Sequence, residues 1–185
     1  MRVISGTARG RRLKELPGMD TRPTTDKVKE SLFNIIQFDI EGRKALDLFG
    51  GTGQLGIEAL SRGAARCTFV DMNRQAADII RENVAAVGFG DRAAIQQGDA
   101  MAFLSGCREK YDLIFLDPPY QTQLLENCVQ AVAKFDILSE HGIMVCESAL
   151  EKQLPELEVP YEKGREYRYG KIKLTVYHRQ GSGDL

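Results

Sequence analysis

The chain has 185 residues, of which 43% are hydrophobic and 28% are charged, and its formal net charge is -1. This size and composition are typical of a soluble globular protein with a core of its own. No apolar run approaches the roughly 20 residues of a membrane-spanning helix, and no signal-like segment follows the first methionine, so a cytoplasmic location without membrane attachment is expected.

Cysteine and histidine usage gives little support for disulfides or for a metal site. The four cysteines form no C-x-x-C pair, and neither histidine lies near a cysteine cluster. Reduced cysteines that pack in the core, and no metal, are therefore expected. The cysteines are Cys67, Cys107, Cys128 and Cys146.

Charge is distributed unevenly along the chain. Residues 1–44 hold ten basic and six acidic side chains, a net +4, and the remaining residues hold 15 and 20, a net -5. A basic arm on an acidic body can dock a polyanion. A solvated hairpin with scattered charges would give the same composition.

The N-terminal residues predict a small hairpin followed by a helix. Residues 2–5 and 12–16 flank a Gly-rich turn, which favours two short paired strands. We expect residues 1–20 to form a basic arm and residues 21–185 to form one domain. Apolar residues at near-helical spacing between 28 and 36 predict a helix that Thr24 or Thr25 would cap.

From residue 45 onward, predicted strands and helices alternate. Strands are predicted at 45–49, 67–70, 93–97, 112–116 and 143–147, helices at 53–62, 73–87, 100–107 and 124–134, and a closing hairpin at 162–168 and 171–178. This alternation predicts an α/β fold with a mostly parallel sheet, helices on both faces and an antiparallel strand near the C-terminus. Ligands of such sheets bind at the carboxyl ends of the strands.

A glycine-rich turn follows the first predicted strand of this alternating region. Gly51-x-Gly53-x-x-Gly56 matches the dinucleotide fingerprint, and Asp71 lies where a ribose-binding acid is expected. Asp47, at the end of the same strand, would repel a pyrophosphate on the following helix N-terminus. The same carboxylate suits a cofactor that carries an ammonium or sulfonium group.

A third acid, Asp99, follows the third strand of this region and could accept a hydrogen bond from an adenine amine. Three acids at three successive strand ends fit a positively charged adenosyl ligand better than a diphosphate. Each acid taken alone could instead be a helix cap.

The strand at 112–116 stops at Asp117-Pro118-Pro119-Tyr120. Neither proline donates a backbone hydrogen bond, and a residue before proline avoids helical angles, so a stiff turn is expected. This turn would present a carboxylate, free backbone carbonyls and an aromatic face. Such groups can stack on a planar ring and accept hydrogen bonds from its amino group. The alternative is an ordinary corner with a surface aspartate.

Together these motifs resemble those of class I S-adenosylmethionine-dependent methyltransferases that act on amino groups. Arg22-Pro23-Thr24-x-x-x-Val28-Lys29-Glu30-x-Leu32-Phe33-Asn34 is similar to the signature of the bacterial 16S rRNA guanine-N2 methyltransferase family. The basic hairpin and the closing Tyr169-Gly170-Lys171-x-x-Leu174 also fit that family, so the resemblance covers nearly the whole chain. Lys29 stands where the family pattern has Arg, which keeps the charge and loses a bidentate contact.

The resemblance implies a Rossmann-like class I methyltransferase sandwich that methylates the N2 amine of one guanine in 16S rRNA. It implies S-adenosylmethionine as cofactor, S-adenosylhomocysteine as product, and the small ribosomal subunit or its assembly intermediate as partner of a monomer. The implied catalytic residues are Asp117, Pro118 and Tyr120. The implied cofactor-binding residues are Thr24, Asp47, Phe49, Gly51, Gly53, Asp71, Met72, Asp99 and Ala100. The implied RNA-binding residues are Arg9, Arg11, Arg12, Lys14 and Arg22.

Four other functions are consistent with parts of the sequence. A DNA adenine or cytosine amino-methyltransferase shares the motif at Asp117, but it usually has a target-recognition insertion, for which no span here is long enough. A protein-glutamine methyltransferase commonly has Asn at that position. An NAD(P)-dependent oxidoreductase would use the glycine turn and Asp71 and would leave Asp47, Asp99 and Asp117 without a role. A non-catalytic RNA-binding module would explain only the basic arm.

Overall fold

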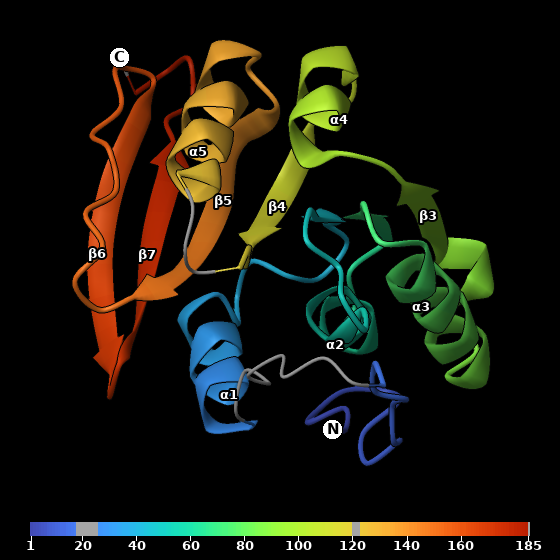
Figure 1. The fold of residues 1–185 in the computed structure, drawn as a ribbon. Helices are drawn as coiled ribbons and strands as arrows, with labels where there is room; N and C mark the ends of the chain where they lie inside the picture. The colour runs from blue at the N-terminus through green and yellow to red at the C-terminus, as the bar shows by residue number, and fades with distance from the viewer. Residues whose placement is uncertain (18–25, 120–122, 185) are drawn as a thin grey trace. The chain divides into compact units, whose positions relative to one another are not determined.

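The computed structural model describes residues 1–17, 26–119 and 123–184 (Figure 1). The chain divides into two compact units, Met1–Asp99 and Ala100–Leu185. The division expected from the sequence, a basic arm of residues 1–20 and a domain of residues 21–185, stays a prediction.

The first unit contains a parallel set of three strands with helices between them. Strand β1 pairs with β2 and β2 pairs with β3, so their carboxyl ends lie at one edge. Asp47 stands opposite Phe69 and Asp71 stands opposite Gln97, the last residue of β3. The elements are α1 (Asp26–Ile35), β1 (Lys44–Asp47), α2 (Gln54–Ser61), β2 (Arg66–Asp71), α3 (Arg74–Ala86), the 3-10 helix η1 (Gly90–Arg92) and β3 (Ala93–Gln97).

The N-terminal segment of this unit folds back on itself as a short hairpin. Its pairing is limited to one antiparallel bridge, between Arg2 and Arg12, flanked by hydrogen bonds between Val3 and Arg11 (2.9 Å) and between Val3 and Gly10 (2.9 Å). The apolar side chains of the segment are buried, which anchors it to the rest of the unit although most of its polar side chains are exposed. The buried side chains are Val3, Ala8, Leu13 and Leu16.

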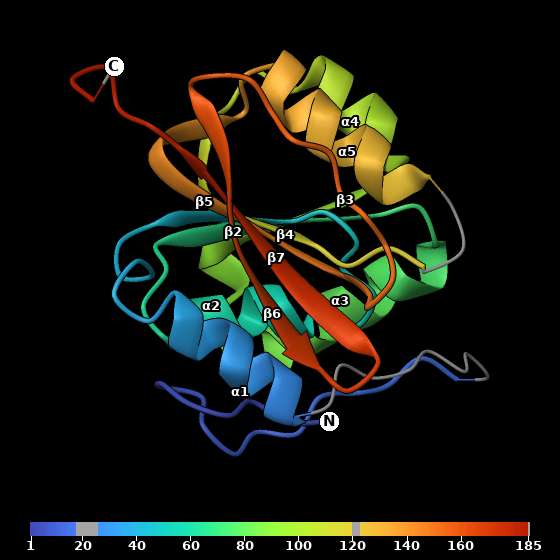
Figure 2. The ribbon, with the colours of Figure 1, turned by 90° about the vertical axis from the view of Figure 1, so that its left-hand side faces the viewer.

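In residues 100–119 and 123–184, the second unit forms four strands and two helices. Strand β4 pairs in parallel with β5, and β7 is antiparallel to both β5 and β6. Helices α4 and α5 lie side by side (Figures 1 and 2). The elements are α4 (Ala100–Gly106), β4 (Tyr111–Leu116), α5 (Leu124–Lys134), β5 (Leu138–Ala149), β6 (Tyr161–Tyr169) and β7 (Ile172–Arg179).

These elements confirm the predicted α/β fold with mostly parallel strands and an antiparallel strand near the C-terminus. The largest difference is in β5, which begins five residues before the predicted start at residue 143. The pairing of β4 with β5 is irregular between Tyr111 and Leu113, and His141 has a φ of 57°. The polar stretch before residue 143 therefore belongs to an irregular start of the strand that alternation of apolar residues does not reveal.

No helix in residues 1–17, 26–119 and 123–184 combines the length and apolar character needed to cross a bilayer. The same residues contain no group of three or more His, Cys, Asp or Glu side chains placed to hold a metal ion. The four cysteines are free thiols, and Cys67, Cys128 and Cys146 are buried.

Candidate functional site

The turn between β1 and α2 depends on its glycines for its shape. Gly51 and Gly53 have φ angles of 57° and 81°, in the left-handed region that favours glycine. Gly56 acts differently, because a Cβ there would lie 2.3 Å from the Phe69 ring and 2.7 Å from the Cys67 sulfur. Two glycines therefore form the turn, and the third lets α2 pack closely on β2.

Asp47 is buried at the end of β1 and is tied to the start of α2. One of its carboxylate oxygens accepts a hydrogen bond from the Gly56 backbone N–H at 3.0 Å. Burial raises the pKa of Asp47 to about 7, although the Gly56 hydrogen bond acts in the opposite direction. A cation bound beside this carboxyl would favour its ionised form.

Asp71 closes the glycine turn onto the end of β2. Its two carboxylate oxygens accept hydrogen bonds from the backbone N–H groups of Gly51 (2.9 Å) and Asn73 (2.8 Å). Asp71 therefore lies against the glycine turn. The carboxylate remains half-buried, and each of its oxygens has lone pairs left for a ligand hydroxyl.

The other predicted cofactor residues have varied exposure. Met72 is 72% exposed although it is apolar, and Asp99 is also exposed. Phe49 is half-buried, and Ala100 is buried at the start of α4 in the second unit. An exposed methionine directly after Asp71 offers an apolar face for a planar ring. Thr24 lies outside the described residues.

In the second unit, the predicted catalytic turn follows β4 directly. Strand β4 is almost entirely buried and ends at Leu116, so Asp117 is the first residue after it. The Asp117 side chain is half-buried, Pro118 is buried and Pro119 is exposed. Tyr120 lies outside the described residues. The expected carboxylate at the carboxyl end of a buried strand is thus present.

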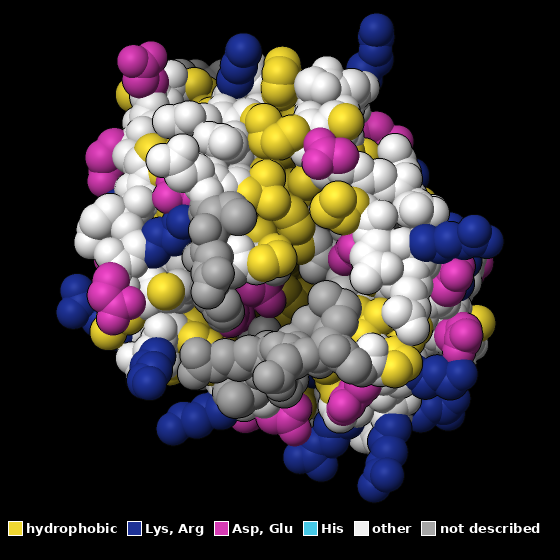
Figure 3. All heavy atoms as spheres, in the orientation of Figure 1, with side chains coloured by type: hydrophobic (Ala, Val, Ile, Leu, Met, Phe, Trp, Pro, Cys, Tyr) yellow, Lys and Arg dark blue, Asp and Glu magenta, His cyan; other side chains and the backbone are white. Residues whose placement is uncertain are grey.

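The basic N-terminal segment contacts α3 close to the glycine turn. The Arg11 guanidinium donates to the Ala86 carbonyl at 2.5 Å, and Lys14 forms an ion pair with Glu82. Arg9 and Arg12 are exposed. In the space-filling view, Lys and Arg side chains (dark blue) project around the part of the surface where the N-terminal segment lies in Figure 1 (Figure 3). Arg22 lies outside the described residues.

A buried asparagine that sequence reasoning missed joins this segment to the glycine turn. The Asn83 side chain donates to the Thr52 carbonyl at 2.8 Å and to the Lys14 carbonyl at 3.1 Å, and accepts from the Lys14 N–H at 2.7 Å. The side chain is 1% exposed. Local spacing could not identify these contacts, because Asn83 lies 31 residues from Thr52 and 69 residues from Lys14.

A buried ionic cluster, formed by Lys29, Glu58 and Arg62, was also missed. The Glu58 carboxylate accepts from the backbone N–H groups of Ile4 (2.8 Å) and Ser5 (2.9 Å) and from Arg62 Nε (2.8 Å). Lys29 Nζ donates to the Arg2 carbonyl at 2.6 Å and lies 3.6 Å from Glu58. Burial lowers the pKa of Lys29, and the neighbouring Glu58 opposes that shift. The sequence signals were the acid among the apolar residues of α2 and the lysine among those of α1.

The chain is similar to known proteins along nearly its whole length. The family model described as "Conserved hypothetical protein 95" matches residues 1–178. The chain is 40% identical to the putative rRNA methyltransferase YlbH of Bacillus subtilis, over 98% of this chain and 100% of that protein. It is 34% identical to ribosomal RNA small subunit methyltransferase D of Escherichia coli K12, over 100% of this chain and 92% of that protein.

A solved structure extends the similarity to the fold. The putative methyltransferase yhhF from Escherichia coli superposes with a TM-score of 0.88 at 34% identity, and the match covers 97% of this chain and 98% of that one. The motif resemblance and the class I methyltransferase fold expected from the sequence are thereby confirmed. The chain therefore belongs to the family described as conserved hypothetical protein 95, and its relatives include the ribosomal RNA small subunit methyltransferases D.

Proposed function

We propose that this protein transfers a methyl group from S-adenosylmethionine to the exocyclic N2 amine of one guanine in 16S rRNA. The substrate is the RNA of the small ribosomal subunit or of its assembly intermediate. Relatives named for small-subunit rRNA methylation along the full chain support the reaction class. The observation that carries the proposal is Asp117, a carboxylate directly after the buried strand β4 and followed by two prolines.

The first unit supplies the proposed cofactor-binding residues. Asp71 would hold the ribose hydroxyls, Met72 would cover the adenine, and Asp99 would accept from the adenine amine. Asp47 would favour the positive charge of the cofactor's sulfonium or ammonium group. Gly51 and Gly53, whose backbones are in the left-handed region, would let the cofactor approach the main chain. A putative methyltransferase, SMU.776, whose solved structure is a complex with SAH, shares the fold with a TM-score of 0.64 at 16% identity.

S-adenosylmethionine supplies an electrophilic methyl group on a sulfonium with a neutral leaving group. The guanine amine is a weak nucleophile, because its lone pair is delocalised into the ring. Asp117 Oδ and the Pro118 carbonyl would accept hydrogen bonds from the two N–H groups of the guanine amine. These hydrogen bonds would return electron density to the amine nitrogen and orient its lone pair. Tyr120 would stack on the base and fix its plane. The proton of the methylated amine would leave to Asp117 or to water.

The target base has to be unstacked to reach such a turn, so the substrate is a flipped base or a base in a single-stranded loop. The basic N-terminal side chains would position the strand through its phosphates. Arg9 and Arg12 extend into solvent and are suited to this role. Arg11 and Lys14 also contact α3 but remain exposed.

The test is methyl transfer from labelled S-adenosylmethionine to 30S subunits, naked 16S rRNA and duplex DNA, with nucleoside mass spectrometry. N2-methylguanosine in either RNA sample is expected, and the better substrate identifies the physiological one. Asp117→Ala should keep cofactor affinity and lose at least about a hundredfold in turnover, the effect of removing one catalytic hydrogen-bonding group. Methyladenine or methylcytosine in DNA would instead establish a DNA methyltransferase, and unchanged turnover in the variant would exclude Asp117 from the chemistry.

A further inference from the structure

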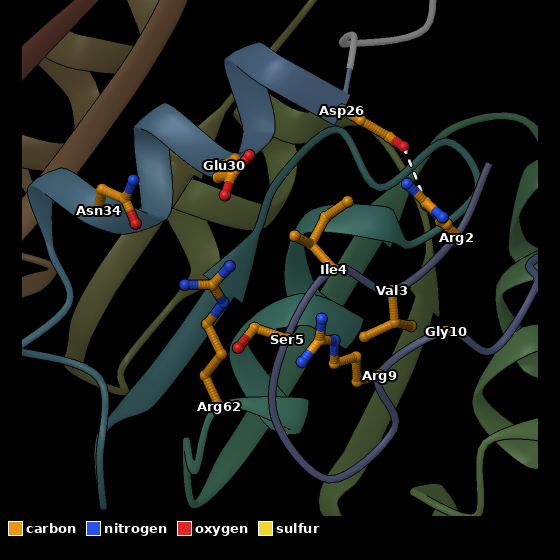
Figure 4. Close-up of a pocket in the computed structure, with 10 residues that line it drawn as sticks. All are labelled: Arg2, Val3, Ile4, Ser5, Arg9, Gly10, Asp26, Glu30, Asn34 and Arg62. Carbon is orange, nitrogen blue, oxygen red and sulfur yellow. Dashed lines mark hydrogen bonds and ion pairs between the residues drawn. The ribbon is translucent and has the colours of Figure 1, made fainter.

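A polar pocket of about 460 Å³ lies between the N-terminal segment, one face of α1 and Arg62 (Figure 4). Its volume is within the range of pockets that hold small-molecule ligands. All of its lining residues belong to the first unit, and none belongs to the glycine turn or to the strand ends. Its lining therefore includes none of the described residues to which cofactor binding is assigned.

One wall of the pocket is a guanidinium held in a fixed position. Arg62 Nε donates to buried Glu58 at 2.8 Å, and the guanidinium carbon lies 4.8 Å from the centre of the Phe33 ring. The Arg62 side chain is only 13% exposed. In Figure 4 its terminal nitrogens point toward Glu30 on α1, and these nitrogens can donate to a ligand.

The remaining polar groups come from α1 and from the N-terminal hairpin. Glu30 and Asn34 are four residues apart, so they lie on the same face of α1, and both are exposed. Arg9 lines the pocket from the hairpin. Across residues 1–17, 26–119 and 123–184, the side chains of Arg9 and Glu30 form no ion pair, whereas Arg2 in the same pocket pairs with Asp26 at 3.2 Å. Arg9, Arg62 and Glu30 are therefore available to a ligand.

This combination of groups selects for a ligand with an anionic part and a hydrogen-bond donor edge. Arg9 and Arg62 favour an anionic or acceptor part of a ligand, and Glu30 favours a part that donates hydrogen bonds. A ribonucleotide carries both features. Guanine fits the set best, because two adjacent N–H donors on its Watson–Crick edge match a carboxylate and its neighbouring O6 accepts from a guanidinium.

We propose that this pocket binds a second, unstacked guanine nucleotide of the substrate RNA, apart from the methylated one. Its phosphate contacts Arg9, its N1–H and N2 amine donate to Glu30, and its O6 accepts from Arg62. The inference rests on the proposed function, because it requires that the protein binds RNA. It assigns to α1 and the hairpin a role in sequence selection beyond general attraction to phosphates.

The test compares binding of fluorescein-labelled single-stranded RNA hexamers that contain one guanine, or inosine in its place, among uridines. Inosine lacks the N2 amine. Glu30→Gln should weaken guanine hexamer binding about tenfold, within the range for a lost bidentate base contact, and should change inosine hexamer binding less. Glu41→Gln is the matched control, because it removes an exposed carboxylate outside the pocket and should leave both affinities unchanged.

Equal guanine hexamer affinities for the wild type and Glu30→Gln would overturn the pocket assignment, and so would equal losses for both hexamers. Methyl transfer to 16S rRNA by the wild type is measured on the same preparations. Transfer with no effect of Glu30→Gln on hexamer binding refutes the pocket alone. No transfer and no RNA binding by the wild type refutes the proposed function together with the pocket.

Discussion

Replacing Asn83 tests whether the N-terminal hairpin and the glycine turn are held together by one side chain. Asn83→Ala removes three hydrogen bonds of 2.7 to 3.1 Å from a side chain that is 1% exposed. At about 1 kcal/mol for each bond, the free energy of unfolding should fall by about 3 kcal/mol. For a chain of this size, that loss lowers the unfolding temperature by about 6–12 °C.

The same substitution should weaken cofactor binding, because the Thr52 carbonyl in the glycine turn loses its donor. It should also increase hydrogen exchange in residues 1–17, because Lys14 loses both backbone contacts to Asn83. Thermal unfolding, calorimetric titration with S-adenosylmethionine and hydrogen exchange measure the three effects. Together they separate loss of the turn from loss of the hairpin.

Lys14→Ala is the control. This substitution removes the exposed ion pair with Glu82 and leaves the backbone contacts to Asn83. It should therefore lower the free energy of unfolding by less than about 1 kcal/mol. An Asn83→Ala protein that unfolds within a degree of the wild type, with unchanged exchange in residues 1–17, would refute the reasoning. It would show that the buried apolar side chains hold the hairpin without these hydrogen bonds.

Three further predictions concern charge. The double variant Arg11→Ala, Arg12→Ala should weaken RNA binding and reduce the slope of log affinity against log salt concentration by at most about two units. Unchanged affinity and slope in salt titrations would mean that the hairpin has only a structural role. Because the folded-state pKa of Asp47 is about 7 against an ordinary 3.8, wild-type stability without cofactor should fall by a few kcal/mol as pH rises from about 4 to 7. Asp47→Asn keeps an oxygen for the Gly56 N–H and should lack this fall, so superimposable melting curves of the two proteins between pH 5 and 8 would contradict the prediction. Burial alone would raise the pKa of Asp136, but hydrogen bonds from Lys110, Tyr161 and Arg179 outweigh it and lower the pKa to about 2. The stabilisation from the ionised Asp136 is therefore present above pH 4 and is lost as pH falls toward 2. Because the carboxylate is half-exposed, Asp136→Asn should lower the free energy of unfolding by only on the order of 1 kcal/mol at pH 7 and should leave it unchanged near pH 2. Chemical denaturation at the two pH values measures this difference.

The strand ends could be predicted well from the sequence, because each one is specified by a few consecutive residues. Apolar runs followed by Asp47, Asp71 and Asp117 place each carboxylate at the end of a strand, and parallel pairing brings the first two to one edge. The glycine spacing likewise specifies a turn whose angles depend only on neighbouring residues. These features follow from short stretches of chain, so they could be predicted without the structure.

The contacts of Asn83 and Glu58 could not be predicted in this way. Glu58 meets Ile4 and Ser5 across more than 50 residues, and no local period encodes that pairing. In the sequence, Lys29 stands where the family pattern has Arg and keeps its charge. The structure shows Lys29 fully buried and bound to the Arg2 carbonyl. Its partner is a backbone oxygen of the hairpin, which has no sequence signature.

The buried Lys29–Glu58 pair explains why the hairpin has a defined position on α1 and α2. Removing two charges from water is costly, and a buried ion pair contributes little net stability unless further hydrogen bonds satisfy it. Here those bonds come from the hairpin backbone: Ile4 and Ser5 donate to Glu58, and the Arg2 carbonyl accepts from Lys29. A shift of the hairpin by one residue would leave both charges buried without these partners. The cluster therefore disfavours other registers. It also fixes the Arg62 guanidinium, which would reduce the ordering cost of binding the proposed RNA ligand.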